Sequence, residues 1–82
     1  MELVPSKRLR RLYKQVADNP KNCPFEDLAR LLEAAGFKRR DTKSSHVVFK
    51  RGSQVITVPF RRPVKEHYIR EALGLIGSVP DA

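Results

Sequence analysis

One histidine, His46, lies among basic residues in the stretch SSHVVFKR, which spans residues 44–51. A histidine that nothing perturbs titrates at about pH 6.5, so this residue type can act as an acid or as a base near neutral pH. Lysine and arginine near such a group can hold a phosphate and stabilise the negative charge that develops on it during reaction. His46 is therefore the candidate catalytic residue, with an ordinary surface histidine as the alternative interpretation.

The whole chain is basic, which favours a polyanionic partner. Its 82 residues include 17 Lys and Arg against nine Asp and Glu, a net charge of +8. Nucleic acid is the usual partner of such a surface, although a basic face without a specific partner is the alternative. If the partner is RNA, the candidate RNA-binding residues near His46 in the chain, or just after the strand expected to pair with it, are Lys43, Ser45, Lys50, Arg51, Arg61 and Arg62.

The sequence offers little support for a metal site, a disulfide or a membrane segment. Cys23, His46 and His67 lack the spacing of metal ligands, so we expect neither metal nor cofactor. As the single cysteine, Cys23 excludes an internal disulfide and indicates a reducing compartment, and we interpret it as structural. No apolar run approaches the roughly 20 residues that span a bilayer, and the basic start lacks the apolar segment of a signal peptide. We therefore expect a cytoplasmic protein with no membrane partner.

Two helices are predicted before the histidine. Residues 6–17 have apolar side chains at helical spacing and basic ones elsewhere, with Ser6 as a cap, and residues 1–5 are expected to be a disordered lead-in. The stretch DNPKNCP interrupts this pattern. Residues 24–36 form a second helical pattern, with a proline in the first turn and a glycine at the stop.

Three strands and a final helix are predicted to follow. The strands span residues 37–42, 46–50 and 54–60, and the short RGS turn joins the last two into a hairpin. A helix fits residues 65–73, and residues 78–82 form a tail. Alternation along the strands leaves His46 on the open face. The side chains expected to face the helices are Val47, Phe49, Ile56 and Val58.

This order of elements predicts an α+β fold of one domain, residues 1–82. Residues 1–22 would be a basic N-terminal helix and linker, and residues 23–77 the core. In the core, a three-stranded antiparallel sheet carries helices on one face, which resembles the double-stranded RNA-binding domain architecture. That architecture recognises A-form RNA by shape and by phosphate and 2′-hydroxyl contacts. The N-terminal helix is an addition, interpreted as a packing or RNA-contacting element.

The motifs FEDLARLLEAAGF, KSSHVVF and VITVPF, followed by a short basic stretch and a helix, resemble the HicA family, small toxins of HicA–HicB toxin–antitoxin systems. The resemblance covers residues 25–76. The family signature is Gly-Ser-His-x-x-Phe followed by a strand that ends in Val-Pro. The residues that match it are Ser45, His46, Phe49, Val58 and Pro59.

The resemblance implies a toxin that cleaves mRNA independently of the ribosome and is neutralised by a HicB-type antitoxin. It also implies that the signature histidine, His46 here, is catalytic. Two positions differ from the family pattern: Ser44 replaces the glycine, and Val47 replaces a second histidine often found there. Glycine alone visits left-handed conformations cheaply, so Ser44 is expected to restrict the turn. Ser45 could orient His46 by a hydrogen bond or could simply form the turn.

The chemistry of RNA agrees with this resemblance. RNA carries its own nucleophile, the 2′-hydroxyl beside the scissile phosphate. A metal-independent nuclease then needs a base, an acid and cations around the developing charge. Two alternatives remain: a non-catalytic RNA-binding module with the same fold, and a protein-interaction domain whose active site has decayed. His67 is interpreted as a surface residue rather than as the second catalytic group.

Overall fold

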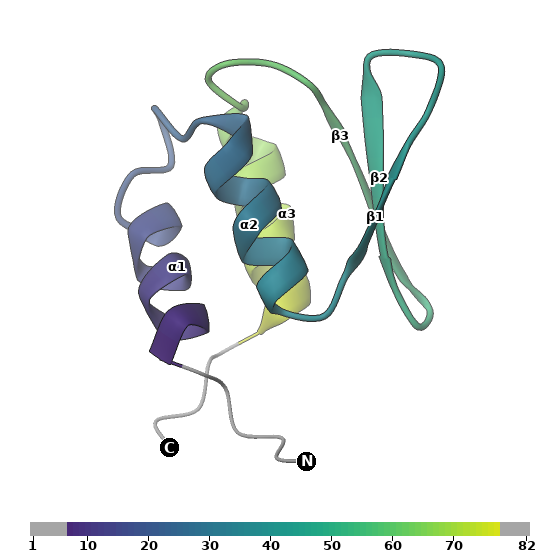
Figure 1. Cartoon of the computed structure of the whole chain (residues 1–82). Helices are drawn as coiled ribbons and strands as arrows, with labels where there is room; N and C mark the ends of the chain where they lie inside the picture. The colour runs from purple at the N-terminus through teal and green to yellow at the C-terminus, as the bar shows by residue number, and fades with distance from the viewer. Residues whose placement is uncertain (1–6, 78–82) are drawn as a thin grey trace.

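The computed structural model describes residues 7–77; the expected cap Ser6, lead-in 1–5 and tail 78–82 lie outside the described residues. Within that range, three helices and three strands follow the predicted order (Figure 1). Their bounds are α1 Lys7–Ala17, α2 Phe25–Ala34, β1 Lys38–Asp41, β2 His46–Arg51, β3 Gln54–Pro59 and α3 Glu66–Ile76.

The strands form one antiparallel sheet in the order β1-β2-β3. The β2–β3 hairpin turns at Gly52 and Ser53, so β2 runs one residue further than predicted, to Arg51. Gly52 has φ +60°, and no residue other than glycine has a positive φ in the described range. Glycine at the first of two turn positions, followed by a residue with negative φ, is the pattern of a type II′ hairpin turn. The turn fixes the register in which His46 faces Pro59.

The helices lie on one side of the sheet and leave its other face open (Figure 1). The inward side chains of the two central strands are buried as predicted: Val47, Phe49, Ile56 and Val58. His46 and Lys50 are exposed on the alternate positions of β2. The α+β architecture predicted from the sequence is thus confirmed, with the helices covering one face.

The end of α2 directs the chain into the sheet, and the end of α3 differs from the prediction. After α2, the N–H of Gly36 donates to the carbonyl of Glu33 (3.0 Å), and the N–H of Phe37 donates to that of Leu32 (2.9 Å). These are the two bonds of a Schellman motif, and Gly36 has the left-handed φ of +101° that the motif requires. The prediction for α3 was too short, because the helix passes Gly74 and ends at Ile76.

Helix α1 packs against α2 and also contacts α3. Val16 is buried in the core, and Leu9, Leu12 and Tyr13 are partly buried against it. The packing interpretation of this helix is therefore confirmed. Its basic residues occupy the remaining positions, and the first turn contains no acidic residue.

Candidate active site

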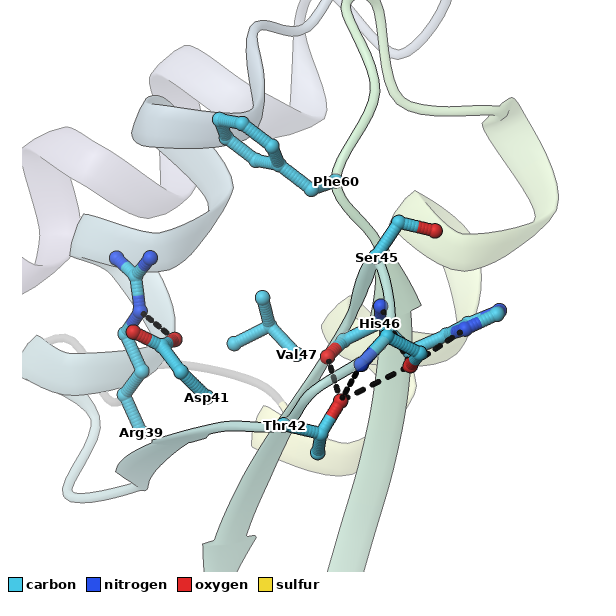
Figure 2. Close-up of a pocket in the computed structure, with 8 residues that line it drawn as sticks. Arg39, Asp41, Thr42, Ser45, His46, Val47 and Phe60 are labelled. Atoms are coloured by element: carbon cyan, nitrogen blue, oxygen red, sulfur yellow. Dashed lines mark hydrogen bonds and ion pairs between the residues drawn. The ribbon is translucent and has the colours of Figure 1, made fainter.

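His46 is the first residue of β2 and is exposed. It lies opposite Pro59, the last residue of β3, where β2 enters the sheet and β3 leaves it. Figure 2 shows its side chain pointing away from Val47 and Phe60. We call this region, made of residues 42–46 and 59–61, the His46 end of the sheet. The hairpin of residues 51–54, with the helix ends it contacts, is the Arg51 end.

A chain of hydroxyl groups holds the imidazole. The Thr42 hydroxyl donates to the carbonyl oxygen of His46 (2.8 Å). Its oxygen also lies 2.9 Å from Ser44 Oγ, which in turn lies 3.3 Å from His46 Nδ1. The N–H of His46 donates to the same Ser44 oxygen at 3.2 Å. Figure 2 shows this network around Thr42 and His46.

Counting hydrogens along this chain assigns the imidazole tautomer. Thr42 has one hydroxyl hydrogen, and the His46 carbonyl takes it. The hydrogen between the two hydroxyls must then come from Ser44, whose oxygen is left as an acceptor. The tautomer that completes all of these contacts as hydrogen bonds is the one in which Nδ1 of His46 carries a hydrogen and donates it to Ser44. In the neutral imidazole, Nε2 is left with a free lone pair and can accept a proton.

Ser44 therefore has a function that the sequence analysis did not anticipate. The expected restriction from losing glycine is not seen, because Ser44 does not have a positive φ. The orienting hydrogen bond considered for Ser45 is made by Ser44 instead. The carbonyl of Ser45 accepts the N–H of Phe60 (2.7 Å), which ties the entry of β2 to the exit of β3.

Two cavities flank His46. The first, the aromatic cavity, lies beside β1. The polar side chains of Arg39, Asp41 and Thr42, together with Phe60, surround the position of Val47 (Figure 2). The second, the cationic cavity, lies between the end of β3 and the first turn of α3 and has a volume of about 210 Å³. His46 and Ser45 line both. The other residues of the cationic cavity are Pro59, Arg61, Lys65, His67 and Tyr68.

Phe60 gives the aromatic cavity an accessible ring. Its side chain is 51% exposed, although its ring packs edge-on against the buried Phe25 with 4.9 Å between centroids. On the other side of the cavity, Arg39 Nε donates to Asp41 (3.0 Å). An exposed aromatic ring near a cation is the kind of surface on which an unstacked base can lie.

The cationic cavity depends on where α3 begins. Val64 is buried, and its N–H donates to the carbonyl of Cys23 (2.9 Å), which anchors the chain immediately before the helix. Lys65 is the N-cap residue, and His67 follows in the first turn, with its ring 4.0 Å from that of Tyr68. Sequence reasoning missed the proximity of His67 to His46, because 21 positions separate them in the chain.

The predicted RNA-binding cations fall into three groups. Arg61 lines the cationic cavity, and Lys43 is exposed in the bend before Ser44. Arg62 instead forms an ion pair with Glu26. The backbone N–H of Glu26 and then the Arg62 guanidinium hold the pKa of that carboxyl below its usual range. Lys50 lies next to the Arg51 end and lines a separate hollow there.

Arg51 follows His46 closely in the chain but lies away from it in the structure. The two residues occupy opposite ends of β2, because a strand rises about 3.3 Å per residue. The Arg51 guanidinium donates to the carbonyl of Ala35 (2.7 Å), to that of Leu75 (3.3 Å) and to the Gln54 side chain (2.7 Å). Its donors are used inside the fold, so Arg51 is a structural residue.

A comparison with protein families identifies the scaffold that holds this site. The model of the HicA toxin of bacterial toxin–antitoxin systems matches residues 25–77. The chain belongs to the HicA toxin family. The match supports a role as the toxin of such a system and begins after α1, so this basic helix precedes the matched region. Searches of curated proteins and of solved structures gave no match.

Two further findings concern the described residues as a whole. Between residues 7 and 77, no helix is long and apolar enough to cross a membrane. In the same range, no three side chains of His, Cys, Asp or Glu gather in a group that could hold a metal ion.

Proposed function

We propose that this HicA-family toxin is a metal-independent endoribonuclease that cleaves mRNA without the ribosome, with His46 as its general base. The observation that carries the proposal is the hydrogen bond between His46 Nδ1 and Ser44, which leaves Nε2 free to accept a proton at an exposed end of the sheet. The family match supports the toxin role, and the net charge of +8 suits an RNA substrate.

The proposed reaction begins at the ribose next to the scissile phosphate. Nε2 of His46 removes the proton from the 2′-hydroxyl, whose oxygen attacks phosphorus. The 2′-oxygen–phosphorus bond forms as the bond to the 5′-oxygen breaks, giving a 2′,3′-cyclic phosphate and a 5′-oxygen that takes up a proton to become a 5′-hydroxyl end. Arg61 lines the cavity beside His46 and can stabilise the charge on the phosphate oxygens.

The substrate must present flexible nucleotides to this end of the sheet. In-line attack by a 2′-hydroxyl needs a backbone that can rotate out of A-form geometry, and single-stranded RNA allows this. The aromatic cavity supports the same conclusion, because Phe60 offers a ring on which an unpaired base can stack. We therefore propose single-stranded segments of mRNA as the substrate.

A HicB-type antitoxin is the proposed inhibitor. The open face of the sheet exposes His46, Lys50 and Val55, the last at 48%. A partner that covers this face would bury His46 and neutralise nearby cations, and it would thereby exclude RNA. The interaction should weaken with salt to the extent that it uses those charges.

The test compares the wild type with His46→Ala, both in bacteria and on purified RNA without ribosomes. We expect growth arrest and mRNA loss with the wild type only, and a cleavage rate lowered by about 10²–10⁴-fold in the variant. Ser53→Ala, in the β2–β3 turn at the other end of the sheet, is the matched control and should cleave normally.

The alternatives predict different results. A non-catalytic RNA-binding module would bind RNA equally well with and without the imidazole, and neither protein would cut it. A decayed interaction domain would bind the antitoxin tightly without cutting RNA or arresting growth. Equal cleavage by the wild type and His46→Ala would remove His46 from the chemistry.

A further inference from the structure

We infer that His67 is the second proton-transfer group of this site, the general acid that protonates the leaving 5′-oxygen, and that the cationic cavity is the subsite for the scissile phosphate. This inference rests on the proposed function. The juxtaposition that carries it is the presence of both histidines of the chain in the wall of one cavity, from two distant elements.

The cavity has the dimensions that a phosphodiester requires. Its volume of about 210 Å³ corresponds to several water molecules at about 30 Å³ each, so a phosphate and its flanking oxygens can enter. His46 reaches it from the start of β2, and His67 from the first turn of α3. Both side chains are exposed, so neither needs to be uncovered before RNA binds.

The charges around the cavity favour a phosphate. Arg61 and Lys65 line it, and neither makes an ion pair with another residue of the range 7–77. The nearest acidic residue in the chain, Glu66, is paired with Arg70 on the same helix (2.6 Å). The N-terminus of α3, an 11-residue helix, adds the positive end of its dipole to the same region.

Contacts within α3 hold His67 in place. Its ring packs against the Tyr68 ring with 4.0 Å between centroids and an interplanar angle of 37°. Tyr68 is half-buried against the core, so it provides a fixed support on one side of the exposed imidazole. This contact restricts rotation of the ring and keeps His67 at the wall of the cavity that His46 also lines.

The complete step uses two imidazoles with opposite starting states. Neutral His46 accepts the 2′-hydroxyl proton at Nε2 as the new oxygen–phosphorus bond forms. His67, protonated at the start, donates a proton to the 5′-oxygen as the old bond breaks. One proton enters and one leaves the protein, so no other reactant is needed. His67 ends neutral and His46 ends protonated.

A modified substrate separates the two roles. An oligonucleotide with sulfur in place of the scissile 5′-oxygen has a leaving group that departs without protonation. His67→Ala should cleave ordinary RNA about 10²–10³-fold more slowly than the wild type, because general acid catalysis is lost. On the sulfur substrate, His67→Ala should match the wild type, whereas His46→Ala should remain slow on both substrates.

The pH profile gives a second readout that a merely structural role would not move. The wild-type kcat/KM should fall at low pH, where a general base is blocked by a proton, and at high pH, where a general acid has none to give. In His67→Ala the fall at high pH should disappear and the fall at low pH should remain. Other titratable or charged groups of this cavity, Lys65, Tyr68 and Arg61, stay unchanged in the variant.

Glu71→Gln, one turn along α3 from His67, is the control for changes on this helix and should cleave both substrates normally. Normal cleavage of ordinary RNA by His67→Ala, or failure of the sulfur substrate to restore its rate, would overturn the inference. If His46→Ala also cleaved like the wild type, the proposed function itself would fail, so the two failures are distinguishable.

Discussion

The two ends of strand β2 carry polar side chains in opposite surroundings. At the Arg51 end, the guanidinium lies 4.6 Å from the centroid of the Phe37 ring and donates to two carbonyls at helix ends. At the His46 end, Nδ1 of the imidazole is hydrogen-bonded to Ser44. Arg61 and Lys65, which line the adjoining cationic cavity, have no acidic partner among residues 7–77.

The difference separates side chains that stabilise the fold from side chains that are free to bind a ligand. The last carbonyls of a helix lack partners within the helix and carry partial negative charge, so a guanidinium that reaches two helix ends stabilises both. Cations left without partners lower stability slightly, but they remain free to bind phosphate. Arg51 therefore connects α2, α3 and the hairpin, while Arg61 and Lys65 remain available to a ligand.

The largest effect of a substitution on the free energy of unfolding is expected at the Arg51 end. Arg51→Ala should lower the free energy of unfolding by about 2–4 kcal/mol, because it removes charged hydrogen bonds to partly buried carbonyls. Urea unfolding followed by circular dichroism measures this. Lys50→Ala, next to it on the exposed face, should change stability by less than about 0.5 kcal/mol.

Arg51→Lys adds a discriminating control. It keeps the charge but loses the planar fork that reaches several acceptors, so its stability should lie between those of the wild type and Arg51→Ala. At a temperature where it remains folded, Arg51→Ala should still cleave RNA at nearly the wild-type rate. A variant that was stable but inactive would show that the Arg51 end takes part in the chemistry.

Much of the fold could be predicted from the sequence, because periodicity reports directly on burial. The inward positions of β2 and β3 follow alternation, and Phe25, Leu28, Leu31 and Leu32 follow helical spacing into the core. The end of α3 could not be predicted in this way. Gly74 suggested a stop, but the helix continues to Ile76, and Gly77 follows as the C-cap with φ +77°. Leu75 and Ile76 pack against the core.

The candidate site was predictable only in part, for a related reason. His46 stands in a recognisable signature, whereas Arg51 and Arg61 look alike in the sequence. What separates them is that Arg51 donates to helix carbonyls that lie 16 and 24 positions away in the chain. The arrival of His67 beside His46 likewise depends on tertiary packing at the start of α3.

A second prediction concerns the interior around Cys23, whose carbonyl accepts the N–H of Val64 just before α3. Cys23 is buried, and burial, with a smaller contribution from the Asp27 carboxylate, raises the pKa of its thiol to about 11. At pH 8 the thiolate is then about a hundredfold rarer than for a thiol with the ordinary value of 9.0. We expect Cys23 to react with a disulfide reagent at least that much more slowly in the folded protein than in urea.

The sign of the related pH effect on stability follows from the same shift. The unfolded chain ionises its thiol first, so this contribution to the free energy of unfolding is fully present below pH 9 and is lost as the pH rises towards 11. Fast labelling of Cys23 in the native state would mean that the interior around it opens, and that the start of α3 is less fixed than the hydrogen bond from Val64 to Cys23 indicates.

The smallest expected effect is a change in kcat at the His46 end. Ser44→Ala removes the acceptor for His46 Nδ1–H, so the neutral imidazole loses the preference that leaves Nε2 free. A hydrogen bond of about 1 kcal/mol corresponds to a five- to tenfold lower kcat, with little change in KM or stability. Ser53→Ala, in the turn at the Arg51 end, is the matched serine control and should be neutral.

The tautomer itself can be observed by nitrogen NMR of the neutral His46 ring. The wild type should carry the proton on Nδ1, because the Thr42 hydrogen is used by the His46 carbonyl and the Ser44 hydrogen by Thr42. Thr42→Val frees the Ser44 hydrogen to donate to Nδ1, so the proton should move to Nε2 and kcat should fall although Ser44 is intact. If the wild-type proton were already on Nε2, the hydroxyl chain would hold the ring without selecting its reactive nitrogen, and His46 would need a different partner to act as a base.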